Sequence, residues 1–195
     1  MEPKTLLITG FEPFGTESRN PSWEAVNALP ERIGDWKLEK LLLPVEFGRA
    51  AVLAIQTAEA NHADAILCVG LAAGRTAVTP ELVGVNVRDA SIADNAGKKA
   101  AGEPIDCDGP AAYFSTLPVR KMVAAILRSR IPAVLSYTAG AYVCNDLLYT
   151  VLRHFSGTPT RAAFVHIPLE KDLPLQDSIC ALTAAIEAID SSEPV

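Results

Sequence analysis

The sequence contains few of the residues that build metal centres and disulfide frameworks. Its four cysteines, Cys68, Cys107, Cys144 and Cys180, are scattered over 195 residues, and no two of them form a CxxC motif. The three histidines and the carboxylates show no spacing typical of a metal site. We therefore expect free thiols in a reducing compartment, and neither a metal ion nor an organic cofactor.

Long apolar runs and clusters of basic residues are also missing. No run reaches the ~20 residues that a transmembrane helix needs, and the N-terminal residues do not resemble a signal peptide. The 17 basic side chains are outnumbered by 23 acidic ones, and they are not gathered into a patch. These absences argue against binding to a membrane or to nucleic acid, and they predict a cytoplasmic protein.

What the chain does contain is typical of one globular domain. Hydrophobic residues make up 49% of it and charged residues 21%, without repeats or low-complexity linkers. The periodicity predicts strands at 5–9, 36–45, 65–70, 133–137 and 161–168, and helices from residue 21, at 47–60, at 118–130, after residue 144 and at 177–189. This alternation predicts a single α/β domain over residues 1–195, a three-layer α/β/α sandwich with a twisted, largely parallel sheet.

The segment around Cys144 is the first candidate for chemistry. Gly140 can form a tight turn between the strand predicted at 133–137 and the following helix, which places Cys144 near the helix N-terminus. Free amides and the helix dipole there favour a thiolate and can bind an oxyanion. His166, at the end of the next predicted strand, is the candidate base. Alone, these two residues favour the simpler alternative of a buried cysteine and a core histidine.

Three further features are open to more than one interpretation. Phe11 and Phe14 lie in a Gly/Pro-bounded segment without GxGxxG spacing, and they form either a binding wall or a cover for the core. Glu81 opens an extended segment at 81–87, and by itself a solvated acid is the commoner role. A long loop is predicted at 89–108, and loops of this length tend to be functional or mobile.

Seven stretches taken together resemble one family, the pyroglutamyl peptidases I, also called pyrrolidone-carboxylate peptidases. They follow the family's order over nearly the whole chain, and each is weak alone. They are 9–15 with 20–22, 70–75, 81 with 85–86, 89–90 with 94–97, 108–114, 138–140 with 143–145, and 164–168.

The resemblance implies a cysteine peptidase that removes an N-terminal pyroglutamyl group from peptides. It implies that Cys144 is the nucleophile of a thioester mechanism, with His166 as base and Glu81 as the group that orients the base. Phe11 and Phe14 match family positions that enclose the substrate ring, and we expect Val143 to add an apolar surface. The family resemblance also suggests a homo-oligomer.

Four positions depart from the family pattern. Leu71 stands where Gln is common, Leu82 where Arg is common, 91–93 where Arg-Ile-Pro is common, and Ala141 where Thr is common. Two alternatives therefore stay open: a diverged thiol hydrolase for another lactam or small acyl group, and a non-catalytic binder of pyroglutamyl ligands. The presence of all three candidate catalytic residues favours an enzyme, because a binder needs none of them.

Overall fold

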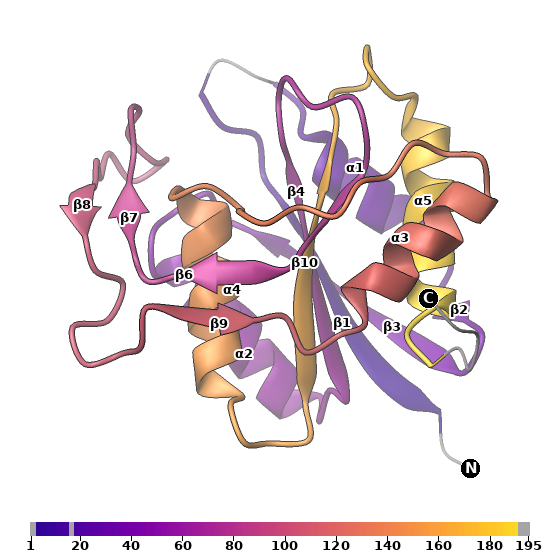
Figure 1. Cartoon of the computed structure of the whole chain (residues 1–195), viewed down its shortest axis with the longest axis horizontal. Helices are drawn as coiled ribbons and strands as arrows, with labels where there is room; N and C mark the ends of the chain where they lie inside the picture. Colours follow the sequence, from indigo (N-terminus) through magenta and orange to yellow (C-terminus); the bar gives the residue numbers. More distant parts are fainter. Residues whose placement is uncertain (1–2, 16–17, 191–195) are drawn as a thin grey trace.

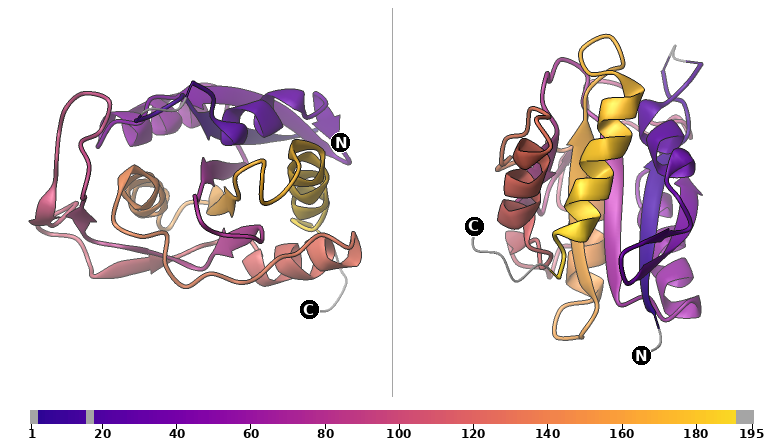
Figure 2. Two further views of the ribbon diagram at one scale, coloured as in Figure 1. Left: turned by 90° about the horizontal axis from the view of Figure 1, so that it is seen from above. Right: turned by 90° about the vertical axis from the view of Figure 1, so that its right-hand side faces the viewer.

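The computed structural model describes residues 3–15 and 18–190, and in them a six-stranded sheet lies between two layers of helices (Figures 1 and 2). The order of its strands is β2-β3-β1-β4-β10-β5. Four neighbouring strands run parallel: β1 (Lys4–Phe11), β3 (Trp36–Leu43), β4 (Ala65–Leu71) and β10 (Arg161–Ile167). Short antiparallel strands, β2 (Arg32–Ile33) and β5 (Thr79–Glu81), form the two edges. The predicted three-layer α/β fold is confirmed.

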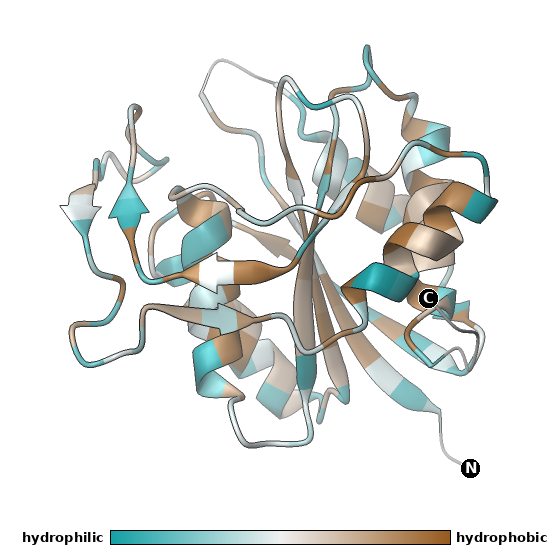
Figure 3. Cartoon of the chain, in the orientation of Figure 1, coloured by the Kyte–Doolittle hydropathy of each residue, from teal (hydrophilic) through white to brown (hydrophobic). Residues whose placement is uncertain are grey.

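The helices divide between the two faces of the sheet. In Figure 1, α2 (Arg49–Ala60) and α4 (Val143–His154) lie to the left of the sheet, and α1 (Pro21–Ala28), α3 (Val119–Arg128) and α5 (Leu175–Glu187) lie to its right. Strand alternation explains the division, because Leu6 and Ile8 of β1 belong to one core and Leu7 to the other. Figure 3 shows the apolar strands between helices that are polar on their outer sides. No described helix is long and apolar enough to cross a membrane.

The segment at 133–137 is not the sheet strand that was predicted. It makes only isolated parallel bridges, Val78 to Ala133 and Glu81 to Ser136, beside the short edge strand β5. Val134 and Tyr137 are largely exposed, so no second layer holds this segment in a full ladder.

The long loop predicted at 89–108 contains regular structure. Its residues 101–103 form β8 (Ala101–Glu103), which pairs with β7 (Arg88–Asp89), and a register shift separates the two residues of β7. A second pair, β6 (Val83–Val85) with β9 (Ala112–Phe114), packs over α4. These pairs are too short to show strand periodicity in the sequence.

The parallel sheet opens between β1 and β4 at its carboxyl end. Pairing of β1 with β3 continues to Phe11, and pairing of β4 with β10 continues to Leu71, whereas pairing of β1 with β4 ends at Thr9 and Cys68. The last residues of the two central strands therefore diverge. Such a crevice is where open α/β sheets bind their ligands.

Helix α1 closes one side of this crevice. Asn20 caps the helix by accepting a hydrogen bond from the Ser22 amide, and Pro21 follows as the first helical residue, as predicted. The Ser22 hydroxyl accepts a hydrogen bond from the Phe11 amide at 3.0 Å. Gly10 permits this approach, because a Cβ atom there would lie 2.7 Å from the Cα atom of Trp23.

We expect Gly10→Ala to lower the thermal midpoint of unfolding, because the added methyl group forces the α1 backbone away from β1. Overpacking of this kind costs about 1–3 kcal/mol. The comparison variant is Gly34→Ala, in which the added Cβ atom meets no neighbour and the cost comes from the φ of +55° alone. Thermal unfolding followed by circular dichroism compares the two variants. An unchanged midpoint for Gly10→Ala would contradict the close helix–strand contact.

Candidate active site

Cys144 is the second residue of α4, at the carboxyl edge of the parallel strands. Gly140 has a φ of +78°, which confirms the predicted turn, and Tyr142 is the N-cap residue. The sulfur lies directly over Gly70 of β4, since a Cβ atom at Gly70 would be 3.0 Å from Cys144 Sγ. The same Cβ atom would be 2.6 Å from the Phe164 ring, so only glycine fits between them.

His166 and Glu81 form a buried pair on neighbouring strands. The Nδ1 atom of His166 lies 2.7 Å from Oε1 of Glu81, and both residues are almost fully buried. The commoner role of Glu81 as a solvated acid is therefore wrong. His166 is also the register partner of Gly70, over which the thiol lies. The structure thus brings all three candidate catalytic residues to the end of β4.

Burial decides the charge of these groups in the free protein. It raises the pKa of Cys144 to about 12, with a further increase from Glu81, and the nearby Arg75 and the helix amide offset this only in part. Burial also lowers the pKa of His166 below its ordinary value, although the hydrogen bond with Glu81 opposes this shift. Both shifts favour the uncharged thiol and the uncharged imidazole in the free protein. For Cys144 this direction is opposite to the one expected from the helix terminus alone.

An apolar pocket opens beside the thiol. It contains about 290 Å³ of empty space including its mouth. Its lining is formed by Phe11, Phe14, Asn20, Val45, Leu71, Tyr142, Val143 and Cys144. The three residues predicted to contact substrate, Phe11, Phe14 and Val143, all belong to it. Phe11 is the last residue of β1 rather than part of a loop, and its ring packs on Phe164 with 6.5 Å between centroids.

Of the four departures from the family pattern, only Leu71 lines this pocket. Leu82 packs against the core on the α1, α3 and α5 side, and Ser91 is exposed. The carbonyl of Ala141 accepts a hydrogen bond from the Asp89 amide. The pocket therefore loses one polar side chain relative to the family pattern, and it becomes more apolar.

Two residues that follow Cys144 hold the site together, and the sequence had not assigned them this role. The side-chain amide of Asn145 hydrogen-bonds the N–H and C=O of Val85, and it also donates to the C=O of Val87. Asp146 is fully buried, accepts from the Gly48 amide and pairs with Arg88 at 2.5 Å. All of these bonds cross long stretches of sequence, so only the folded chain identifies them.

The segment at 89–108 supports the aromatic wall of the pocket. Asp94 accepts a hydrogen bond from the Phe47 amide. Asn95 donates to Glu12 Oε1 and to the carbonyl of Pro13, directly before Phe14. These bonds join the segment to the residues that precede Phe14, and a functional or a mobile role for it stays a prediction. Among the described residues, no group of three or more His, Cys, Asp or Glu side chains is placed to hold a metal ion.

An α/β sandwich that places a half-buried thiol near a buried imidazole and carboxylate, beside an apolar pocket, has the features of a cysteine hydrolase. The comparisons with known proteins specify which one. The model of the pyroglutamyl peptidase family matches residues 4–191, and the chain belongs to this family of cysteine peptidases.

Curated and solved relatives cover nearly the whole chain. A pyrrolidone-carboxylate peptidase of Staphylococcus aureus is 40% identical, over 96% of this chain and 94% of the relative. The crystal structure of pyroglutamyl peptidase I from Bacillus amyloliquefaciens superposes with a TM-score of 0.92 at 36% identity, covering 99% of this chain and 98% of that one. The pyrrolidone carboxyl peptidase of Thermococcus litoralis gives 0.92 at 32% identity, covering 98% and 100%.

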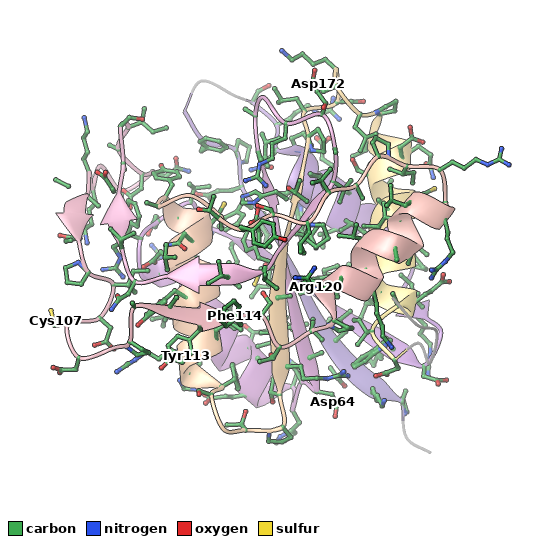
Figure 4. All side chains as sticks on the ribbon, in the orientation of Figure 1. Asp64, Cys107, Tyr113, Phe114, Arg120 and Asp172 are labelled. Atoms are coloured by element: carbon green, nitrogen blue, oxygen red, sulfur yellow. The ribbon has the colours of Figure 1, made fainter. Side chains whose placement is uncertain are left out.

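We expect alkylation of Cys144 by iodoacetamide in the free protein to keep accelerating up to at least pH 10. The reason is the pKa of about 12, since the thiolate is the reacting species. Cys107, which is exposed on a loop far from the sheet (Figure 4), is the internal reference. Mass spectrometry of both sites over a pH series makes the measurement. A plateau of the Cys144 rate near pH 7 would mean that the thiol is already ionised.

Proposed function

We propose that this protein hydrolyses the bond after an N-terminal pyroglutamyl residue, with Cys144 as nucleophile, His166 as general base and acid, and Glu81 as the orienting carboxylate. The observation that carries the proposal is the apolar pocket that opens onto Cys144 beside the buried His166–Glu81 pair. A pyroglutamyl ring is small and uncharged. Apolar walls with a few polar contacts suit such a ring, because it carries no charge with which a side chain could form an ion pair.

The catalytic steps follow from the neutral resting pair. Glu81 bonds to Nδ1 of His166, which leaves Nε2 as the acceptor for the thiol proton. As Cys144 attacks the carbonyl carbon, its proton moves to His166, and Glu81 stabilises the imidazolium that forms. Amides at the N-terminus of α4 are suited to receive the oxyanion. His166 then protonates the leaving amine, and water hydrolyses the thioester.

Backbone groups of Leu71 supply the polar contacts that the pocket walls lack. Within a parallel strand, consecutive residues direct their N–H and C=O groups to opposite neighbours. The amide of Ala72 donates to Ile167 of β10, so the backbone groups of Leu71 point toward β1, where pairing has already ended at Cys68. One donor and one acceptor therefore face the crevice, which matches the C=O and N–H of a lactam. The apolar side chain of Leu71 does not remove them.

Two further properties stay predictions from the sequence. A cytoplasmic location suits a protein whose function requires a free thiol, because that compartment keeps thiols reduced. A homo-oligomeric state is suggested by the family resemblance, and light scattering of the purified protein measures it.

We expect hydrolysis of pyroglutamyl-4-nitroanilide, weak hydrolysis of the prolyl amide, and none of the glutamyl or glutaminyl amides. Proline leaves the buried donor unpaired, at a cost of about 1–3 kcal/mol. A charged amine in the apolar pocket costs several kcal/mol. Comparison of kcat/KM for the four amides makes the measurement. Cys144→Ala, folded by circular dichroism, should lose all turnover.

Two variants test the pocket itself. Phe11→Ala and Phe14→Ala should each impair use of the pyroglutamyl substrate. Equal kcat/KM values for the pyroglutamyl and prolyl amides would favour a diverged thiol hydrolase of broader range. Binding of pyroglutamate without turnover of any amide would favour a non-catalytic binder.

The acid limb of kcat/KM should lie below pH 6.5. His166 must be neutral to accept the thiol proton, and burial lowers its pKa, so the neutral base persists to lower pH than for an exposed histidine. His166→Ala should reduce kcat by about 10²-fold or more, the usual scale for lost acid–base catalysis. His62→Ala and His154→Ala are the controls, since both residues are exposed. An acid limb of kcat/KM above pH 7 would contradict a His166 whose pKa is lowered by burial.

A further inference from the structure

Arg75 contacts the candidate catalytic pair, yet neither the sequence motifs nor the proposed mechanism assigns it a role. Its guanidinium donates to Glu81 Oε1 at 2.6 Å, the same oxygen that lies 2.7 Å from His166 Nδ1. A second nitrogen of the guanidinium donates to the carbonyl of Thr138 at 3.1 Å. Thr138 belongs to the turn that leads through Gly140 to Cys144. Arg75 thus bridges the segment that carries the acid and the segment that carries the nucleophile.

The charge balance around Glu81 requires such a partner. Glu81 is fully buried, and its Oε2 atom has no hydrogen-bond partner among the described residues. A buried carboxylate without a cation is strongly destabilised. If Arg75 were absent, a proton shared between Glu81 and His166 would compensate the buried charge. While that proton is on His166, the imidazole is charged before substrate arrives and cannot act as a base.

We propose that Arg75 is a positioning residue that neutralises Glu81, so that His166 stays uncharged and correctly oriented in the resting enzyme. This inference rests on the proposed function of the same site. The charged and titratable groups around the imidazole agree with it. Arg75 lowers the pKa of His166, Glu81 raises it, and Cys144 is subject to the same two charges. Arg75 does not line the apolar pocket, so it acts through Glu81 rather than on the substrate ring.

The test replaces Arg75 by Met and by Lys and measures kcat, KM and the pH profile with pyroglutamyl-4-nitroanilide. Arg75→Met should lower kcat about tenfold or more with KM within about threefold, because His166 is no longer held neutral and oriented while the pocket is unchanged. Its acid limb should move to higher pH, because the pKa of His166 is no longer lowered by the guanidinium. Arg75→Lys should keep the limb near its wild-type position. Since Arg75 is 30% exposed, added guanidinium chloride at millimolar concentration should partly restore Arg75→Ala.

Arg88→Met is the matched control, because Arg88 also pairs with a fully buried carboxylate, Asp146. It should lower the thermal midpoint without moving the acid limb. A loss of kcat in Arg75→Met that only follows the loss of folded protein, with an unmoved limb and no guanidinium rescue, would overturn the proposal. If Arg75→Met does not fold, two other measurements test the proposal. The acid limb of Arg75→Lys should stay near its wild-type position, and guanidinium should partly restore the activity of Arg75→Ala.

A second readout separates this inference from the proposed function. NMR titration of the His166 ring in wild type and in Arg75→Met reports its protonation without turnover, and His62 and His154 serve as exposed references. The pKa of His166 should rise in the variant and not in Arg88→Met. An unchanged His166 titration would refute the role of Arg75 even if the wild-type enzyme is active. Absent wild-type turnover with a shifted titration would refute only the proposed function.

Discussion

The divergence of β1 from β4 is the constraint on which the site depends. If the two strands stayed paired to their ends, the backbone of Leu71 would be used in the sheet and no crevice would exist. Instead, the amide of Phe11 donates a hydrogen bond to the Ser22 hydroxyl, and the ring of Phe11 forms an aromatic wall on one side of the crevice. Gly70 then leaves room for the Cys144 sulfur on the other side. The apolar pocket and Cys144 therefore meet where strand pairing between β1 and β4 ends.

The burial that this geometry imposes also determines the electrostatics. A thiol at a helix N-terminus is ordinarily easier to ionise, and the dipole effect amounts to about 0.3–1 kcal/mol at exposed sites. Cys144 is half-buried, and desolvation still exceeds this contribution to its pKa. His166 is affected in the same direction, toward its neutral form. Both shifts favour a proton on sulfur and a free acceptor on nitrogen, so in the proposed mechanism charge separates only during the reaction.

The sequence predicted what short-range chemistry controls. The Asn20–Pro21 helix start, the turn at Gly140 and the place of Cys144 in α4 were all correct, because caps and turns depend on neighbouring residues. The burial of Glu81 was not predictable from composition. It depends on the antiparallel pairing of β5 with β10, which joins residues more than eighty positions apart.

Errors arose where local pattern and tertiary context disagree. The segment at 133–137 has strand-like composition. It runs along the outer side of β5, which has only three residues, and forms just two isolated bridges. The pair β7–β8 has no apolar face to bury, so nothing in its sequence distinguishes it from a loop. The sign of the Cys144 pKa shift was missed for the same reason. Proximity to a helix end is readable from the sequence, whereas depth below the surface is a property of the whole fold.

An uncharged site suits the uncharged lactam of the proposed substrate. A resting thiolate and imidazolium would keep water in the pocket, because two charges are costly to desolvate. With both groups uncharged, the ring can displace that water against Phe14 and Val143 at little electrostatic cost. In the proposed mechanism the ion pair forms only as sulfur bonds to carbon, when Glu81 and the helix amides are already in place to stabilise it. Under that proposal, selectivity for an uncharged terminal residue and an uncharged resting site follow from the same burial.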